Sequence, residues 1–312
     1  MESIIQVRNL EKHYKDRKAL NSISFDVREG EILCVLGPNG AGKSTLINIL
    51  STVLDYDDGE IYFRGNKVER VKKDYKGILG IVPQDIAIYE DISAEDNVKF
   101  FASLYGIRGR TLNSHVEMAL NSVGLLERKK DKPKTFSGGM KRRLNIACAI
   151  AHNPKIIIMD EPTVGVDPQS RNHILDHIKS MSKAGTTIIY STHYMEEVEE
   201  ISTRIIIMDQ GEIIAEGTKE ELKEMLGEEK VYYIEVDNME KLQKDELYMV
   251  EGVTDVEIVD RKILVSVLRG IENLDKLIST IMYKGLKINN ISSTTMNLDT
   301  VFLKLTGRNL RD

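Results

Sequence analysis

The sequence predicts an α/β fold built on a mostly parallel sheet, with a phosphate-binding site where the strands end. Two observations support this prediction. Residues 37–45 have the spacing G-x-x-x-x-G-K-[ST] and lie between an apolar run and a helical pattern. Short runs that are rich in β-branched residues and apolar on both faces, as buried parallel strands are, occur at 32–36, 78–82, 156–159, 187–190 and 205–208.

The segment 37–45 has the features of a phosphate-binding loop. Glycines let its backbone curl so that several N–H groups point at one anion, and the following helix adds the positive end of its dipole. Lys43 is expected to reach the β- and γ-phosphates of a nucleotide, and the Ser44 hydroxyl to take a place on Mg²⁺. An ordinary glycine turn is the alternative, which the flanking strand and helix disfavour. The residues expected around the phosphates are Gly37, Asn39, Gly40, Ala41, Gly42, Lys43, Ser44 and Thr45.

Polar groups follow the carboxyl ends of the predicted strands, where open α/β sheets bind ligands. Asp160 ends one apolar run and is expected to hold Mg²⁺ directly or through water. The next residue, Glu161, is the expected general base that polarises the attacking water. Gln84 is expected to contact Mg²⁺ and orient that water, and His193 to donate to a γ-phosphate oxygen. The sequence therefore predicts phosphoryl transfer to water.

The other elements of the first part follow from hydrophobic periodicity. Strands are expected at 4–9 and 23–27, joined by a polar stretch at 11–18, and at 60–63 after a turn. Tyr14 in the polar stretch offers an aromatic face to adenine. Apolar residues at three- to four-residue spacing predict helices within 93–128, from 137 to about 152 and near 168–183.

A second, smaller domain is predicted after a linker at 227–230. The elements that follow are expected in the order strand-helix-strand-strand-helix-strand. This order is ferredoxin-like. Its strands are expected at 231–236, 253–259, 263–267 and 288–291, and its helices near 239–249 and 271–284, before a last helix that carries Leu298, Val301, Phe302 and Leu305. The predicted domains are therefore residues 1–226 and 227–312. The second has no catalytic cluster, which leaves a dimerisation or packing module and a regulatory ligand site both open.

Composition restricts the class of protein. A formal net charge of −6 over 312 residues argues against a nucleic-acid binder. Cys34 and Cys148 lie in apolar segments without disulfide or metal-ligand spacing, which suits a reducing cytoplasm. No signal peptide is expected after Met1. No apolar run approaches the roughly 20 residues that span a bilayer, so a membrane process would need another chain.

Together these residues resemble the nucleotide-binding subunit of an ATP-binding cassette (ABC) transporter. The deciding match is Phe136–Lys141, which stands between Gln84 and the acidic pair, where that family carries its signature sequence. The resemblance covers about residues 2–220. It implies a P-loop NTPase domain of the ABC type, with a helical subdomain at about 88–152 that docks on a membrane partner. Residues 89–93 and 100–101 are the expected contact, and ordinary helix packing is the alternative for each of them.

The resemblance also implies roles for single residues. Two such domains pair head to tail, so that Ser137, Gly138 and Gly139 of one close on ATP held by Lys43 of the other. A helix that begins after Ser137 would offer its N-terminal amides to the γ-phosphate. The remaining matches are Gly40, Gly42, Lys43, Ser44 and Thr45 in Walker A, Gln84 in the Q-loop, Asp160 in Walker B, Glu161 as catalytic glutamate, Asp167 in the D-loop, His193 as switch histidine and Tyr14 on adenine. Phe136 and the D-loop segment 164–168 depart from the usual leucines but stay apolar.

The ending 297–308 resembles drug-resistance and sodium-efflux exporter ATPases of the ABC-2 type. The main hypothesis is therefore the ATP-hydrolysing subunit of an exporter. It would use ATP and Mg²⁺ and lie on the cytoplasmic face of the cell membrane. Its expected partners are a membrane-spanning permease and a second nucleotide-binding domain, with no nucleic acid.

Two alternatives come from other classes of protein. A soluble ABC ATPase of translation or DNA repair usually has two cassettes or a long coiled coil, whereas this chain has one cassette and no sustained heptads. A catalytically inactive, ATP-binding regulator is disfavoured by the presence of Lys43, Asp160, Glu161 and His193. The sequence leaves open the transported substrate, the identity of the permease, the choice of homodimer or heterodimer, and the role of the second domain.

Overall fold

The structure is a computed structural model that describes residues 3–15, 17–224, 229–237, 244–259, 262–268, 271–295 and 298–306. The chain divides between Lys219 and Glu220 into two compact units. The predicted boundary after residue 226 falls among residues 225–228, which lie outside the described part. The division between the compact units falls within the short helix α8 (Lys219–Glu224).

A six-stranded sheet forms the centre of the first unit, in the order β10-β9-β3-β8-β7-β6. All neighbouring pairs are parallel except β10 with β9. This confirms the predicted α/β fold. The strands are Ile32–Leu36 (β3), Leu79–Val82 (β6), Ile156–Asp160 (β7), Thr187–Thr192 (β8), Arg204–Asp209 (β9) and Glu212–Gly217 (β10).

The register of the central strands brings their carboxyl ends to one edge. Asp160 of β7 lies opposite Ser191 of β8, and Leu36 of β3 lies opposite Thr192. The residues that follow these strands therefore emerge side by side. Because both faces of a parallel sheet are covered, the loops at this edge are where the polar chemistry is placed.

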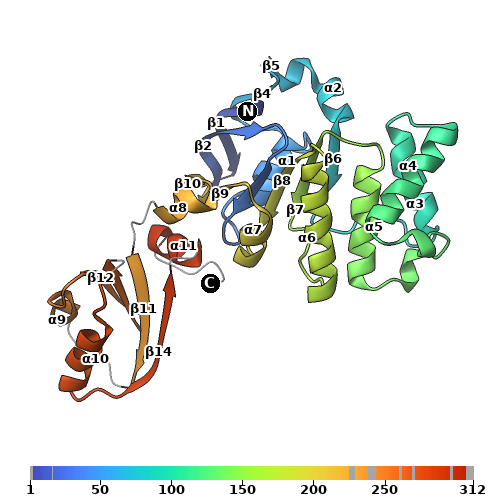
Figure 1. Ribbon diagram of the computed structural model, residues 1–312. Helices are drawn as coiled ribbons and strands as arrows, with labels where there is room; N and C mark the ends of the chain where they lie inside the picture. The colour runs from blue at the N-terminus through green and yellow to red at the C-terminus, as the bar shows by residue number, and fades with distance from the viewer. Residues whose placement is uncertain are drawn as a thin grey trace. The chain divides into compact units, whose positions relative to one another are not determined.

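Helices and a second sheet cover the two faces of the central sheet (Figure 1). Side chains such as Leu33, Val35 and Ile158 share one hydrophobic core with the helix α1 (Lys43–Leu50) and with the antiparallel sheet. The helices α6 (Pro168–Lys183) and α7 (Met195–Ile201) pack against β8, and α7 also against β3. Alternate residues of a strand face opposite sides, which explains why these strands are apolar throughout.

The antiparallel sheet corrects one expectation. Residues 11–18 do not form a polar connection between two short strands, because β1 (Ser3–Tyr14) and β2 (Arg17–Arg28) pair as far as Tyr14 and Arg17. Register shifts around Leu10 and Lys12 interrupt the alternation of buried and exposed residues, so the sequence pattern hides a continuous ladder. The sheet has the order β2-β1-β4-β5, with β4 at Asp58–Phe63 and β5 at Asn66–Lys67.

A helical part lies beyond β6, as predicted. Its helices are α3 (Ala94–Leu104), α4 (Gly109–Ser122) and α5 (Gly138–Ile150), which pack on one another (Figure 1). Short 3-10 turns occupy 126–128 and 133–135. A third 3-10 turn, 68–70, and the helix α2 (Lys72–Gly77), which the sequence pattern did not reveal, precede β6.

The second unit contains a four-stranded antiparallel sheet in the order β12-β13-β11-β14. Its described elements are β11 (Glu229–Val236), α9 (Lys244–Tyr248), β12 (Val253–Val259), β13 (Lys262–Leu268), α10 (Leu274–Tyr283), β14 (Ile288–Thr295) and α11 (Leu298–Thr306). Of the predicted linker, residues 229–230 belong to β11 and residues 227–228 lie outside the described part. Residues 239–243 of the helix expected at 239–249 also lie outside the described part. The unit has its own hydrophobic core, formed by β11–β13 with α9 and α10.

Among the described residues, no helix combines the length and the apolar composition needed to cross a bilayer. Cys34 and Cys148 are both buried and free, and burial raises the pKa of both thiols. They are therefore core residues, in agreement with the sequence pattern.

Candidate nucleotide-binding site

A pocket of about 430 Å³ opens over the loop between β3 and α1. Its size lies within the range of small-molecule sites. The structure brings Tyr14, Gln84 and Glu161, which are far apart in the sequence, to this one pocket. Its lining residues are Tyr14, Arg17, Ala19, Asn39, Gly40, Gly42, Lys43, Ser44, Thr45, Gln84 and Glu161.

The loop conformation requires glycine at two of its positions. Gly42 has a φ of +106°, and a Cβ there would lie 2.6 Å from the carbonyl oxygen of Ala19. A Cβ on Gly37 would lie 2.4 Å from the carbonyl oxygen of Met208. Among the described residues no side chain caps the N-terminus of α1. The first amides of α1 are therefore left to bind an anion.

Lys43 is held in the pocket by the loop itself. Its Nζ donates to the carbonyl oxygens of Gly37 at 2.8 Å and of Pro38 at 3.1 Å, and it lies 3.3 Å from Oε1 of Glu161. Burial lowers the pKa of Lys43, while the carboxylates of Glu161 and Asp160 act in the opposite direction. The ammonium group therefore lies at the pocket, between the loop carbonyls and Glu161.

The two acidic residues at the end of β7 have different partners. Oδ1 of Asp160 accepts a hydrogen bond from the Ser191 hydroxyl at 2.5 Å. Oε1 of Glu161 lies 3.1 Å from Nδ1 of His193. Glu161 adopts a φ of +45°, and its N–H donates to both the carbonyl and the hydroxyl oxygen of Ser191 at 3.1 Å. This turn directs neighbouring carboxylates to different places.

Glu197 of α7 is hydrogen-bonded to residues at the ends of the same strands. It is 1% exposed. Its carboxylate accepts hydrogen bonds from Thr163 at 2.5 Å, from Tyr190 at 2.9 Å and from Thr192 at 2.8 Å, and Nε of Arg171 lies 3.5 Å away. The hydroxyls come from residues close to Glu161 and His193. Glu197 therefore ties together the two loops that carry them.

Sequence reasoning missed Arg17, Ser191 and Glu197. Arg17 lines the pocket and donates to the carbonyl oxygen of Gly40 at 2.8 Å. A serine at the end of β8 and an acidic residue on the buried side of a short helix were the available signals, but neither is specific. The contacts of Ser191 with Asp160 and of Glu197 with Thr163 join residues 31 and 34 positions apart in the sequence. Only the fold therefore reveals them.

Oxygen ligands for a hard cation are present at this edge of the sheet. Ser44 and Gln84 line the pocket, and Asp160 follows on the adjoining strand end. Hydroxyl, amide and carboxylate oxygens are the donors that Mg²⁺ prefers. Among the described residues no group of three or more His, Cys, Asp or Glu side chains could hold a metal. The side-chain oxygens of Ser44, Gln84 and Asp160 are nevertheless of the type that fits Mg²⁺.

The signature residues do not line this pocket. Ser137 caps α5, where its Oγ accepts from the N–H of Met140 at 3.2 Å. Gly139 packs on the start of α6, since a Cβ there would lie 2.5 Å from Oγ of Ser170. Asp167 caps α6 and its pKa is lowered by hydrogen bonds from Ser170. Ser137, Gly138, Gly139 and Asp167 therefore form a second cluster, separate from the phosphate loop of the same chain.

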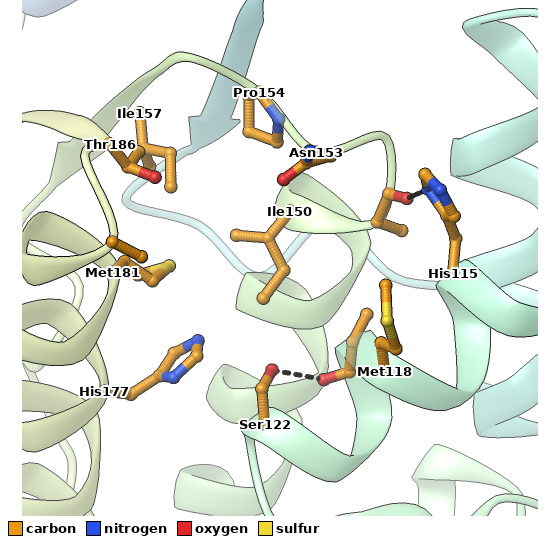
Figure 2. Close-up of a pocket in the computed structure, with 13 residues that line it drawn as sticks. His115, Met118, Ser122, Ile150, Asn153, Pro154, Ile157, His177, Met181 and Thr186 are labelled. Carbon is orange, nitrogen blue, oxygen red and sulfur yellow. Dashed lines mark hydrogen bonds between the residues drawn. The ribbon is translucent and has the colours of Figure 1, made fainter.

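A smaller cavity of about 210 Å³ lies between α4, α5 and α6 (Figure 2). Met118, Ile150 and Met181 give it a largely apolar lining. Burial lowers the pKa of His177, and its Nε2 has no hydrogen-bond partner within the described residues. Among the described residues, none of those predicted to bind nucleotide borders this cavity.

Comparisons with known proteins agree with this geometry. The family model for ABC transporters matches residues 20–164. The chain is 40% identical over 311 residues to the linearmycin resistance ATP-binding protein LnrL of Bacillus subtilis, covering 99% of this chain and 100% of that one. It is 32% identical over 310 residues to the daunorubicin resistance ATP-binding protein DrrA3 of Streptomyces coeruleorubidus, covering 99% and 98%.

Solved structures are similar over about 70–80% of this chain. The ATP-binding cassette MJ0796, a dimer in a post-hydrolysis state bound to ADP and Pi, has a TM-score of 0.63 and 27% identity, covering 69% of this chain and 98% of that one. CbiO1 of Clostridium perfringens, part of an ABC transporter complex, has a TM-score of 0.66 and 30% identity, covering 72% and 92%.

The phosphate loop, the paired acids and the parallel sheet define a P-loop ATPase. More narrowly, the chain belongs to the ATP-binding proteins of the ABC transporter family.

Proposed function

We propose that this chain is the ATP-hydrolysing subunit of an ABC-2 type exporter that removes drug-like compounds from the cell. The observation that carries the proposal is the extent of the similarity. The match to the two resistance proteins covers 99% of this chain and therefore includes the second unit, whereas the solved ATP-binding subunits cover 69–79%. The second unit is thus shared with the resistance proteins and goes beyond the common cassette.

Each residue of the pocket has a different role in the proposed hydrolysis of ATP. The ring of Tyr14 stacks on adenine, and the amides of α1 with Lys43 bind the phosphates. Lys43 moves from its contacts with Gly37 and Pro38 to the β- and γ-phosphates. Mg²⁺, which neutralises phosphate charge, would be held by Ser44, Gln84 and Asp160.

Glu161 acts as the general base. Its carboxylate accepts a proton from water as the water oxygen bonds to the γ-phosphorus and the bond to the β–γ bridging oxygen breaks, giving ADP and phosphate. His193, which lies 3.1 Å from Glu161 through Nδ1, orients that carboxylate and donates to the γ-phosphate. Binding of ATP draws Lys43 away from Glu161 and so removes one of the two contacts of its Oε1, the other being with His193.

A second nucleotide-binding domain completes the site. Ser137 and Gly138 are exposed at the N-terminus of α5, apart from their own phosphate loop. They offer α5 amides to ATP held by the partner, with Gly139 and the D-loop residue Asp167 beside them. Closure of the two domains on ATP, and their release after hydrolysis, would drive transport.

An exposed aromatic cluster is the proposed contact for the permease. It consists of Tyr89, Phe100 and Phe101, with Tyr89 52% and Phe100 40% exposed. Aromatic groups that protrude from a helical surface suit the burial of a partner's helix. The chain would thereby be peripheral on the cytoplasmic face of the membrane, with the second unit as an accessory or regulatory domain.

Co-purification tests the exporter function. The Glu161→Gln variant, held with ATP and Mg²⁺ in its native cell, should co-purify from detergent-solubilised membranes with a stoichiometric polytopic protein. Replacing Tyr89 and Phe100 by serine should remove that partner and leave ATP binding intact. A chain recovered only from the cytosol, or on ribosomes or DNA, would contradict the transport function and leave the ATPase chemistry in place.

A further inference from the structure

The segment 83–93 connects the nucleotide pocket to the aromatic cluster. It runs from β6 to α3 without helix or strand. Gln84 near its start lines the pocket, and Tyr89 belongs to the cluster. An irregular segment must satisfy its backbone polar groups by other means. Here side chains of α3 and α5 bind them, so the position of the segment depends on these helices.

Arg142 of α5 holds the segment where Gln84 lies. One guanidinium nitrogen donates to the carbonyl oxygen of Pro83 at 2.9 Å and the other to that of Gln84 at 2.6 Å. The side chain is 5% exposed. Two donors in a rigid plane that bind consecutive carbonyls fix the orientation of the peptide between them. They therefore fix the direction in which the Gln84 side chain leaves the backbone.

Burial of this guanidinium is costly for an ordinary packing residue. Within the part of the chain that the structure describes, Nε of Arg142 has no hydrogen-bond partner. Loss of this side chain would also leave the carbonyl groups of Pro83 and Gln84 without these hydrogen bonds. The cost therefore suits a residue retained for what it positions.

Two further side chains continue the connection toward the aromatic cluster. Asn145, on the same side of α5 as Arg142, accepts from the N–H of Ala87 at 3.3 Å. Asn97 of α3 is fully buried and pairs with both the N–H of Tyr89 at 2.7 Å and its carbonyl oxygen at 2.9 Å. The segment is thus bound to the helical part from Pro83 to Tyr89.

We propose that Arg142 is a positioning residue that couples the signature helix α5 to Gln84, so that both move together when two nucleotide-binding domains close. The N-terminus of α5 carries Ser137 and Gly138, and Arg142 follows on the same rigid helix. A displacement of this N-terminus therefore displaces the backbone of Gln84. The inference rests on the proposed function through the role of Gln84 at Mg²⁺ and water.

A matched pair of variants of the full-length chain tests this coupling. Arg142→Met removes both hydrogen bonds to the segment. Arg143→Met removes a similar bond, from Arg143 to the carbonyl oxygen of Val123 at 3.0 Å, inside the helical part. We expect Arg142→Met to lower kcat and to raise the Mg²⁺ concentration for half-maximal ATPase activity by about 10- to 100-fold, as loss of a group that orients a metal ligand does. Arg143→Met should leave the Mg²⁺ dependence unchanged. Equal Mg²⁺ dependence in both variants would overturn the proposal.

A double-mutant cycle separates positioning from general support. If Arg142 acts through Gln84, then Arg142→Met should reduce kcat no further in a Gln84→Ala background. A full additional loss there would overturn the role of Arg142 while leaving that of Gln84 in place. Normal turnover in Gln84→Ala alone would instead overturn the proposed role of Gln84, and the coupling with it. If Arg142→Met does not fold, it is replaced by Arg142→Lys. Lysine keeps the charge but cannot donate from two guanidinium nitrogens to both carbonyl groups, so this variant should show the same shift in Mg²⁺ dependence.

Discussion

Nζ of Lys43 and Oε1 of Glu161 lie 3.3 Å apart, in a pocket where both side chains are almost fully buried. The residue proposed to bind phosphate and the residue proposed to activate water are therefore paired with each other. A phosphate that attracts Lys43 breaks this pair. Under the proposed mechanism, substrate binding would therefore also remove Lys43 from the general base, whose Oε1 stays 3.1 Å from Nδ1 of His193.

Glu161→Gln should preserve ATP binding, lower turnover by about 10²- to 10⁴-fold and trap a dimer, because an amide fills the same space but takes no proton. Dimerisation is measured by light scattering with saturating ATP and Mg²⁺. In the double variant Lys43→Ala/Glu161→Gln nucleotide binding is lost, and the chain should stay monomeric. A Glu161→Gln chain that is also monomeric under these conditions would contradict the head-to-tail dimer.

Ser191→Ala should weaken the use of Mg²⁺, because the hydroxyl that donates to Asp160 is lost. Groups that orient metal ligands typically contribute about 10- to 100-fold to metal affinity or activity. The measurement is the Mg²⁺ dependence of ATP hydrolysis. Ser180→Ala, which removes a hydroxyl bonded to the carbonyl of Asp176 on the exposed side of α6, is the matched control. Identical Mg²⁺ curves would show that Ser191 does not position Asp160.

Glu197→Gln should lower the free energy of unfolding by about 1–3 kcal/mol. Both carboxylate oxygens of Glu197 accept hydrogen bonds from hydroxyls, whereas the NH₂ group of a glutamine amide cannot accept one. Turnover should also fall, since Thr163 and Thr192 border the loops of Glu161 and His193. Glu200→Gln, on the same helix but in an exposed ion pair with Lys179, should cost less than about 1 kcal/mol. Urea denaturation compares the two, and equal losses would contradict the supporting role of Glu197.

Acid should destabilise the protein through His152. Burial lowers the pKa of His152 from 6.5 to about 4. Its ring stacks on Tyr105 with centroids 3.5 Å apart, and its Nε2 lies 2.9 Å from the carbonyl oxygen of Leu79. Between these pH values the unfolded chain binds a proton that the folded chain does not, so stability falls as pH decreases from about 6.5 to 4. His152→Gln should flatten the unfolding free energy in this window. An unchanged slope would assign the acid sensitivity to other groups.

The fragment 1–226 should bind ATP with the affinity of the full chain. The two compact units have separate hydrophobic cores, so the first does not need the second to form its pocket. Calorimetric titration of ATP into both proteins measures this, with Lys43→Ala in the fragment as the control that should not bind. Loss of binding in the unmutated fragment would show that the boundary is wrong.

Contiguous features of the site could be predicted from the sequence. The spacing from Gly37 to Thr45 encodes a turn that only glycine-rich sequences adopt, and the apolar run before it identifies the strand. Asp160 and Glu161 were recognisable because they end a second such run. By contrast, the continuous hairpin of β1 and β2 was missed, because irregular register around Leu10 conceals the alternation on which strand prediction depends.

The sequence by itself determined the nucleotide chemistry, because the phosphate loop is local and each polar residue ends a recognisable strand. Only the tertiary structure decided which groups hold those residues in place. Ser191 donates a hydrogen bond to Asp160, and Glu197 accepts one from Thr163 in the loop that follows. Arg142 donates to the carbonyl oxygen of Gln84, and all three contacts join residues that are far apart in the sequence. A hydrogen bond between distant segments leaves no periodic pattern in the chain, since it depends on where parallel strands and packed helices place their ends.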